Sequence, residues 1–144
     1  MRNKLDAYMT PSLAAKAYIN RICSNFSYDD LVLECCCGDG SIVEAIAPHF
    51  NWVITNDINP EVEADTHLDL TLPKSWQQLS EADWIISNLP FNVAHKIIPL
   101  AYEHARKGCI FLLRITFNEP TKARRQFLVT YPPQHRNTTQ RISF

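Results

Sequence analysis

LVLECCCGDGSI, residues 31–42, is the stretch from which the fold of this chain can be predicted. It begins with a short apolar run at residues 31–33 that is typical of a buried strand. Gly38 and Gly40 then let the backbone turn sharply and approach a ligand closely, because no Cβ stands in the way. A helical pattern opens at Ser41. A strand, a glycine turn and a helix in this order predict the first βα unit of a nucleotide-binding α/β sheet.

The charges around this turn indicate the kind of ligand. Glu34 and Asp39 flank the turn, and carboxylates there would repel a pyrophosphate and attract a cation. S-adenosylmethionine fits, because it carries an ammonium and a sulfonium group and no phosphate. Asp57 follows a second apolar strand, at the distance where an acid bonds ribose hydroxyls in this topology. An NAD oxidoreductase is the disfavoured alternative, since Val43 stands where the dinucleotide pattern has its third glycine.

Three further motifs stand in a characteristic order. They are YMTP at residues 8–11, NDINP at residues 56–60 and NLPF at residues 88–91, the last after an apolar strand. With the glycine turn, they resemble the motifs of class I S-adenosylmethionine-dependent methyltransferases, and NLPF is similar to the N-P-P-Y/F motif of N6-adenine methyltransferases. The resemblance runs from Asp6 to Phe144. It implies an α/β, Rossmann-like methyltransferase fold with a mostly parallel, doubly wound sheet.

The resemblance also implies a reaction, the transfer of a methyl group to the N6 amino group of adenine in nucleic acid. The expected catalytic residues are Asn88, Leu89, Pro90 and Phe91: the Asn88 side-chain oxygen and the Leu89 carbonyl would hold the amino group, and Phe91 would stack on the base. The expected cofactor-binding residues are Tyr8, Thr10, Glu34, Cys36, Gly38, Gly40, Asp57, Ile58, Asp69, Leu70 and Asn88. The likeness of the tail to phage-type enzymes favours DNA as substrate; RNA is the alternative, and an inactive binding relative is a second class.

Several of these residues have purely structural alternatives. Asn88 and Pro90 would suit an ordinary exit from a strand into a turn, and Phe91 would suit the core. Asp69 could cap the segment that follows it, and Glu34 could support the turn or cap a helix. We expect no metal site, because the five cysteines and the histidines lack zinc-ligand spacing, and we expect the cysteines to be free thiols.

The charges of the chain are divided unevenly. Residues 1–104 carry a net charge of −8, and residues 105–144 carry +7. This asymmetry indicates a polyanion partner for the C-terminal part, with a solvated helix face as the alternative. The predicted nucleic-acid contacts are Lys122, Arg124, Arg125 and Arg136.

Composition and pattern give the remaining predictions. The 144 residues, 46% hydrophobic and 20% charged, suit one domain spanning residues 1–144. No apolar run approaches the roughly 20 residues of a membrane span, and the start lacks the apolar core of a signal peptide, so we expect a cytoplasmic protein. The pattern predicts helices at residues 11–23, 41–47, 93–105 and 119–129. It predicts strands at residues 31–33, 52–56, 66–70, 83–87 and 109–117, and the start of another at 140–144.

The predicted strand at residues 109–117 would lie at an apolar edge of an incomplete sheet, which soluble proteins avoid. The full methyltransferase fold has seven strands; here the seventh, which lies antiparallel beside this one, would be missing, and the sixth would barely begin at residues 140–144. Three explanations stand side by side: a missing C-terminal segment, a homo-oligomer that covers the edge, or a tail that folds back over it.

Overall fold

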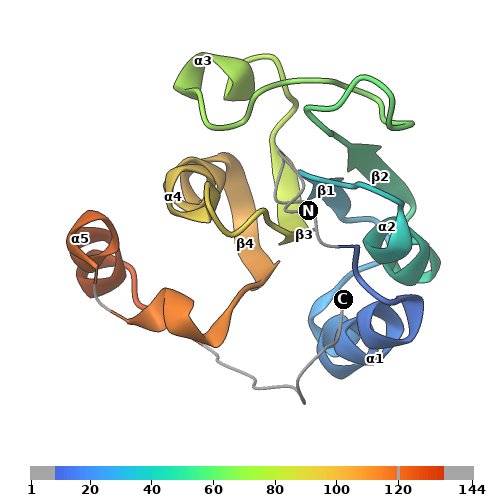
Figure 1. Ribbon diagram of the computed structural model, residues 1–144. Coiled ribbons are helices and arrows are strands. Elements are labelled where there is room, and N and C mark those ends of the chain that lie inside the picture. Colours follow the sequence, from blue (N-terminus) through green and yellow to red (C-terminus); the bar gives the residue numbers. More distant parts are fainter. Residues whose placement is uncertain (1–8, 120, 135–144) are drawn as a thin grey trace.

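A parallel sheet with helices on both faces forms the described part of the chain, residues 9–119 and 121–134 of the computed structural model (Figure 1). Its strands are β1 (Leu31–Glu34), β2 (Trp52–Thr55), β3 (Ala82–Asn88) and β4 (Ala105–Leu112). They lie in the order β2-β1-β3-β4, and every neighbouring pair is parallel. The predicted α/β class is confirmed at this level. Tyr8, Arg136 and the predicted strand at residues 140–144 lie outside the described residues.

Alternate residues of the central strands point to opposite faces, and each face has its own apolar core. Val32 and Ile86 pack with α1 (Ser12–Ile22) and α2 (Ser41–Ile46) on one face. Leu33 and Ile85 pack on the other face with α4 (Ala94–His104). The remaining helices are α3 (Pro73–Trp76), α5 (Lys122–Thr130) and the short 3-10 turns η1 (Cys23–Asn25), η2 (Ala47–His49) and η3 (Ile115–Asn118). None of the helices in the described part is long and apolar enough to cross a membrane.

Two predicted strands differ from the observed ones. Residues 66–70 form no strand; they contribute only an isolated bridge between Thr66 and Asn56. The strand predicted at residues 109–117 begins earlier, at Ala105, because its first residues pair with β3. It also ends earlier, at Leu112, and the chain then turns into η3. Within the described residues β4 is the edge of the sheet, so its cover by a further segment or by a second copy stays a prediction.

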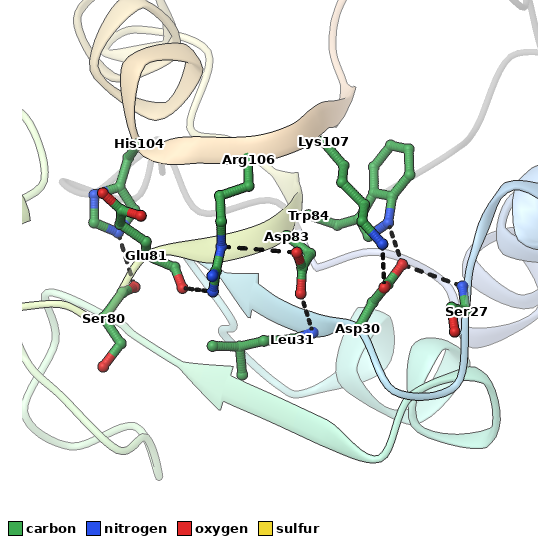
Figure 2. A network of polar contacts seen from close by, with 10 residues as sticks. All are labelled: Ser27, Asp30, Leu31, Ser80, Glu81, Asp83, Trp84, His104, Arg106 and Lys107. Carbon is green, nitrogen blue, oxygen red and sulfur yellow. Dashed lines mark hydrogen bonds and ion pairs between the residues drawn. The ribbon is translucent and has the colours of Figure 1, made fainter.

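A network of polar contacts joins the strands at their amino ends (Figure 2). Asp30 accepts hydrogen bonds from the Trp84 indole at 2.8 Å and the Ser27 N–H at 3.1 Å, and it pairs with the Lys107 ammonium at 2.5 Å. Burial raises the pKa of Asp30, but the hydrogen bonds from Lys107, Ser27 and Trp84, together with the charge of Lys107, outweigh burial and hold this pKa below its usual value. The network therefore links the entry to β1 with β3 and β4.

Asp83 and Arg106 extend this network (Figure 2). Asp83 accepts a hydrogen bond from the Leu31 N–H at 2.9 Å and lies 3.7 Å from the Arg106 guanidinium, which also donates to the Glu81 carbonyl at 2.9 Å. His104 contacts the Ser80 carbonyl at 2.9 Å. Side chains thus join the strands at the amino edge of the sheet, whereas ligands of open parallel sheets bind at the carboxyl edge.

Candidate functional site

The polar residues that the sequence singles out gather at the carboxyl edge of the sheet. Glu34 is the last residue of β1, Asn88 is the last residue of β3, and Asp57 follows β2 closely. The chain goes from β1 outward to β2 and returns on the other side of β1 as β3. The connections therefore diverge between β1 and β3, and this is the point of an open parallel sheet where ligands bind.

Asp57 accepts a backbone hydrogen bond from the glycine turn. Gly38 and Gly40 have φ angles of 51° and 80°, which side chains with a Cβ rarely adopt. The Gly38 N–H donates to one oxygen of Asp57 at 2.9 Å, and the Asn59 N–H donates to the other at 2.9 Å. Asp57 stays partly exposed. Because each carboxylate oxygen has about two acceptor positions, Asp57 can accept further hydrogen bonds from a ligand.

Glu34 is fully buried, and only part of its carboxyl group is satisfied. One oxygen accepts hydrogen bonds from the Ser87 hydroxyl and, at 3.2 Å, from the Cys36 N–H. The other oxygen has no hydrogen-bond partner among the described residues. Burial raises the pKa of Glu34 to about 8, the bonds from Ser87 and Cys36 lower it in part, and the charge of Asp57 raises it again. At neutral pH this raised pKa favours the protonated form of Glu34, and a cation beside the carboxyl group would favour the charged form.

The buried side chain of Asn56, next to Asp57, connects the end of β1 with residues 66–68. The sequence analysis did not predict its role. Its buried amide nitrogen donates to the carbonyls of Cys35 at 3.0 Å and Leu68 at 3.1 Å. Its oxygen accepts from the Leu68 N–H at 2.9 Å and the Thr66 hydroxyl at 2.8 Å. The side chain thus replaces the hydrogen bonds of a sheet ladder, which explains why residues 66–70 follow the sheet without joining it. An asparagine directly before the predicted ribose acid was the available signal.

The predicted adenine-binding residues have local structural roles. One Asp69 oxygen accepts from the Thr71 N–H at 3.0 Å and the Thr71 hydroxyl at 2.6 Å, a turn closed by an acid. Leu70 is buried in the core, and its carbonyl accepts from the Trp76 indole at 2.9 Å. Ile58 is 52% exposed beside Asp57. Their roles toward a ligand stay predictions.

Residues 88–91 lead from the end of β3 toward α4. The Asn88 amide donates to the hydroxyl of buried Thr10 at 2.7 Å, so the segment before α1 reaches the site. Leu89 is buried in the core. The Pro90 carbonyl accepts from the N–H groups of Val93 and Ala94 at 3.2 and 3.0 Å and so starts α4.

Arg114 lies against this segment and was also missed by the sequence analysis. Its guanidinium carbon is 4.6 Å from the centre of the Phe91 ring, a distance typical of cation–π stacking. The Arg114 side chain is exposed, and it follows the end of β4. The structure therefore brings together Thr10, Asn88, Phe91 and Arg114 on the β3–β4 side of the carboxyl edge.

The cations predicted on the helix at residues 119–129 divide into two kinds. Lys122 and Arg125 are exposed on α5. Arg124 instead donates to the Phe117 carbonyl at 2.9 Å and the Thr121 hydroxyl at 2.9 Å, and its guanidinium lies 4.9 Å from the Phe117 ring centre. Arg124 therefore stabilises the junction between η3 and α5.

The thiols near the site are free. Burial raises the pKa of the Cys35 and Cys36 thiols well above their usual value, and the charge of Glu34 acts in the same direction. Such thiols are poor nucleophiles. Among the described residues, no group of three His, Cys, Asp or Glu side chains is placed to hold a metal ion.

Comparison with known proteins supports the fold. No protein-family model matches the chain, and no curated protein matches it. The fold is similar to that of a solved structure described as precorrin 8W decarboxylase from Methanobacterium thermoautotrophicum, with a TM-score of 0.61 and 16% sequence identity. The match covers 88% of this chain and 77% of that chain. At this identity the likeness concerns the fold alone.

The identification of the chain as an N6-adenine methyltransferase of nucleic acid is corrected by these findings. No protein-family model matches, and the solved structure with a similar fold is named as a decarboxylase. The predictions of a methyltransferase, of an adenine target and of DNA methylation are therefore wrong as well. The structure also shows why a four-residue motif was a weak guide: Leu89 fills the core and Pro90 starts α4, so the fold itself needs these residues.

Proposed function

We propose that the carboxyl edge of this sheet binds S-adenosylmethionine, as a Rossmann-like nucleotide-binding site. The observation that carries the proposal is the pair of acids at the glycine turn. Glu34 has a buried oxygen without a hydrogen-bond partner among the described residues, and Asp57 grips the turn at Gly38. An ammonium donor would satisfy the Glu34 oxygen and favour its ionised form, whereas a phosphate would meet the carboxylate of Asp57 and would bring no donor to the Glu34 oxygen.

The residues present can be assigned to parts of this ligand. Asp57 would accept the ribose hydroxyls, the backbone at Gly38 and Gly40 would approach the ligand closely, and Glu34 would accept from the ammonium group. Asp69 is the candidate acceptor for the adenine amino group. When bound, S-adenosylmethionine would bring a sulfonium cation to this edge of the sheet.

Isothermal titration calorimetry of the purified chain tests the proposal. We expect saturable, one-to-one uptake of S-adenosylmethionine, and binding of ATP and NADH that is weaker by about tenfold or more, since their phosphates carry the opposite charge. A chain that takes up no S-adenosylmethionine, or that binds NADH as tightly, would contradict it.

A second candidate function is contact with single-stranded nucleic acid through α5. Lys122 and Arg125 are exposed on this helix. Where α4 meets the end of α5, Tyr102 and Tyr131 are 49% and 45% exposed, with ring centres 4.5 Å apart. A cationic surface combined with exposed aromatic rings is the usual means of holding single strands without sequence preference.

Fluorescence anisotropy with a labelled oligonucleotide tests this contact, with DNA and RNA of the same sequence compared because DNA is the expected partner. The variant Lys122→Gln/Arg125→Gln should bind more weakly and with a flatter dependence on salt, by a slope of about 1 to 2 for the two lost charges. The control Arg21→Gln/Lys74→Gln removes two exposed charges elsewhere and should leave the slope unchanged. Equal slopes in the two variants would contradict the assignment to α5.

A further inference from the structure

We propose that Arg114 is the anion-binding residue of a second ligand subsite, beside Phe91 at the carboxyl edge of the sheet, which takes a phosphate or carboxylate group. The identity of the first ligand rests on the proposed function above; the anion subsite stands on its own geometry.

The first argument is the position of Arg114. In the pairing of β3 with β4, Asn88 lies opposite Leu112. Arg114 follows Leu112 by only two residues, so it leaves the sheet at the same edge as Asn88. Because parallel strands deliver their following residues to one edge, Arg114 lies on the side of the sheet where ligands bind.

The second argument is that the guanidinium is held in place by groups that are themselves fixed. The Phe91 ring lies 4.6 Å from the guanidinium carbon. Phe91 directly follows buried Leu89 and Pro90, and the Pro90 carbonyl accepts the first hydrogen bonds of α4. A guanidinium that stacks on a ring keeps its N–H groups in its own plane, and this planar fork matches the two oxygens of a carboxylate or phosphate.

The third argument is the separation of charge along the carboxyl edge. Glu34 ends β1, Asp57 and Asp69 follow β2, and Arg114 follows β4 on the other side of β3. A single cationic ligand would use only the acidic side. Arg114 therefore suits the anionic group of a second ligand, bound beside the first, since complementary charge selects what binds on each side.

An NMR titration of the ¹⁵N-labelled chain tests the subsite. The probes are inorganic phosphate and, separately, acetate, with ionic strength kept constant by sodium chloride. We expect a saturable shift of the Arg114 side-chain Nε–H signal and of the Leu89 amide. Tighter phosphate binding would point to a phosphorylated ligand, and tighter acetate binding to a carboxylate. A shift that rises linearly without saturation for both probes would overturn the proposal.

Matched variants locate the effect. Arg114→Gln should bind the probe about tenfold more weakly, as expected for the loss of a hydrogen bond to a charged group. Arg114→Lys should recover only part of the affinity, because it keeps the charge and loses the fork. Arg21→Gln, the same change in the last turn of α1, should bind like the wild type. Equal losses in Arg21→Gln and Arg114→Gln would overturn the proposal. Phe91→Leu, which leaves Arg114 intact, should also weaken binding, and full affinity in this variant would overturn the stacking argument.

The subsite and the proposed function fail separately. Arg114→Gln should bind S-adenosylmethionine as the wild type does. Saturable phosphate binding without uptake of S-adenosylmethionine would overturn the proposed function and leave the subsite standing, and the reverse result would overturn the subsite alone.

Discussion

Ser87, one residue before the end of β3, donates a hydrogen bond to Glu34 at the end of β1. This bond joins the two central strands at the point where the chain connections diverge. It satisfies one oxygen of a fully buried carboxyl group, and the other oxygen has no partner among the described residues. A carboxyl group in this position is held mainly in its protonated form, since burial raises its pKa to about 8.

Glu34 should make the folded state less stable as the pH rises. Its pKa is about 8 in the folded chain, against the usual 4.5 that we assign to the unfolded chain. Between these values the folded state holds a proton that the unfolded state has released, so the free energy of unfolding falls with pH. The stabilising contribution is complete below pH 4.5 and is lost as the pH rises through 8. The total loss is on the order of a few kcal/mol.

Urea unfolding from pH 5 to 9 measures this slope in the wild type and in Glu34→Gln, which has no proton to release. We expect the variant to gain stability relative to the wild type as the pH rises. Glu103→Gln, a change at an exposed acid of α4, is the control and should follow the wild type. Parallel curves for the wild type and Glu34→Gln would show that the carboxyl group does not titrate in this range.

Asp57→Ala should weaken the binding of S-adenosylmethionine. The substitution removes the acceptor for the ribose hydroxyls and also releases the Gly38 N–H that shapes the turn. The expected loss is about 1–3 kcal/mol, the scale of hydrogen bonds to a charged group. Calorimetry measures this loss. The control is Glu61→Gln, which removes the negative charge of an exposed acid in the following loop and so measures the effect of charge alone. An equal loss in both variants would mean that Asp57 acts only through its charge at a distance.

The elements that could be predicted from the sequence are those set by local pattern. The apolar runs of β1 and β2 gave strands within a residue of the observed bounds, and the glycine turn gave the start of α2 at Ser41. Residues 66–70 were assigned to a strand because Leu68 and Leu70 alternate with polar residues. The two leucines are instead turned toward the core because the Asn56 side chain hydrogen-bonds the Leu68 backbone and holds this segment beside the sheet. Local periodicity cannot distinguish these two causes.

In the candidate site, too, some residues could be predicted from local sequence pattern and others could not. Glu34, Asp57 and Asn88 could be placed at one edge from the sequence, because residues after neighbouring parallel strands share that edge. Arg114 could not, because its position depends on where β4 ends, and the apolar run that continues to Phe117 hides that end. The protonation of Glu34 depends on burial by residues distant in sequence. The function assigned from the short motif at residues 88–91 was wrong, because such motifs also serve folding.

Asp30→Ala should destabilise the fold from the amino edge of the sheet. The substitution leaves the Trp84 indole and the Ser27 N–H without their acceptor and the Lys107 ammonium without its partner (Figure 2). Breaking a hydrogen-bonded buried acid of this kind costs about 2–4 kcal/mol, with Lys107 contributing little because it is half exposed. The urea midpoint at pH 7 measures this cost, and Asp29→Ala at the exposed neighbouring position is the control.

The same acid should also contribute to acid unfolding. Its folded pKa lies below the usual 3.8, so its stabilisation is present above pH 3.8 and is lost as the pH falls through the folded value. Stability measured from pH 5 to 2 should fall less steeply in Asp30→Ala than in the wild type. An unchanged acid slope would contradict the assignment of this network to Asp30.

Gly108→Ala tests the packing between β3 and β4. A Cβ on Gly108 would lie 2.9 Å from Cζ3 of Trp84, closer than real Cβ contacts. The indole cannot move away easily, because it donates to Asp30 at 2.8 Å and lies edge to face with Phe26 at 5.3 Å between ring centres. Overpacking of this kind costs about 1–3 kcal/mol. A double-mutant cycle with Trp84→Leu measures it by urea unfolding, and the cost of Gly108→Ala should largely disappear once the indole is gone. If alanine at position 108 is equally costly with and without the indole, the clash is not its cause, and a backbone preference for glycine in β4 would have to explain the loss.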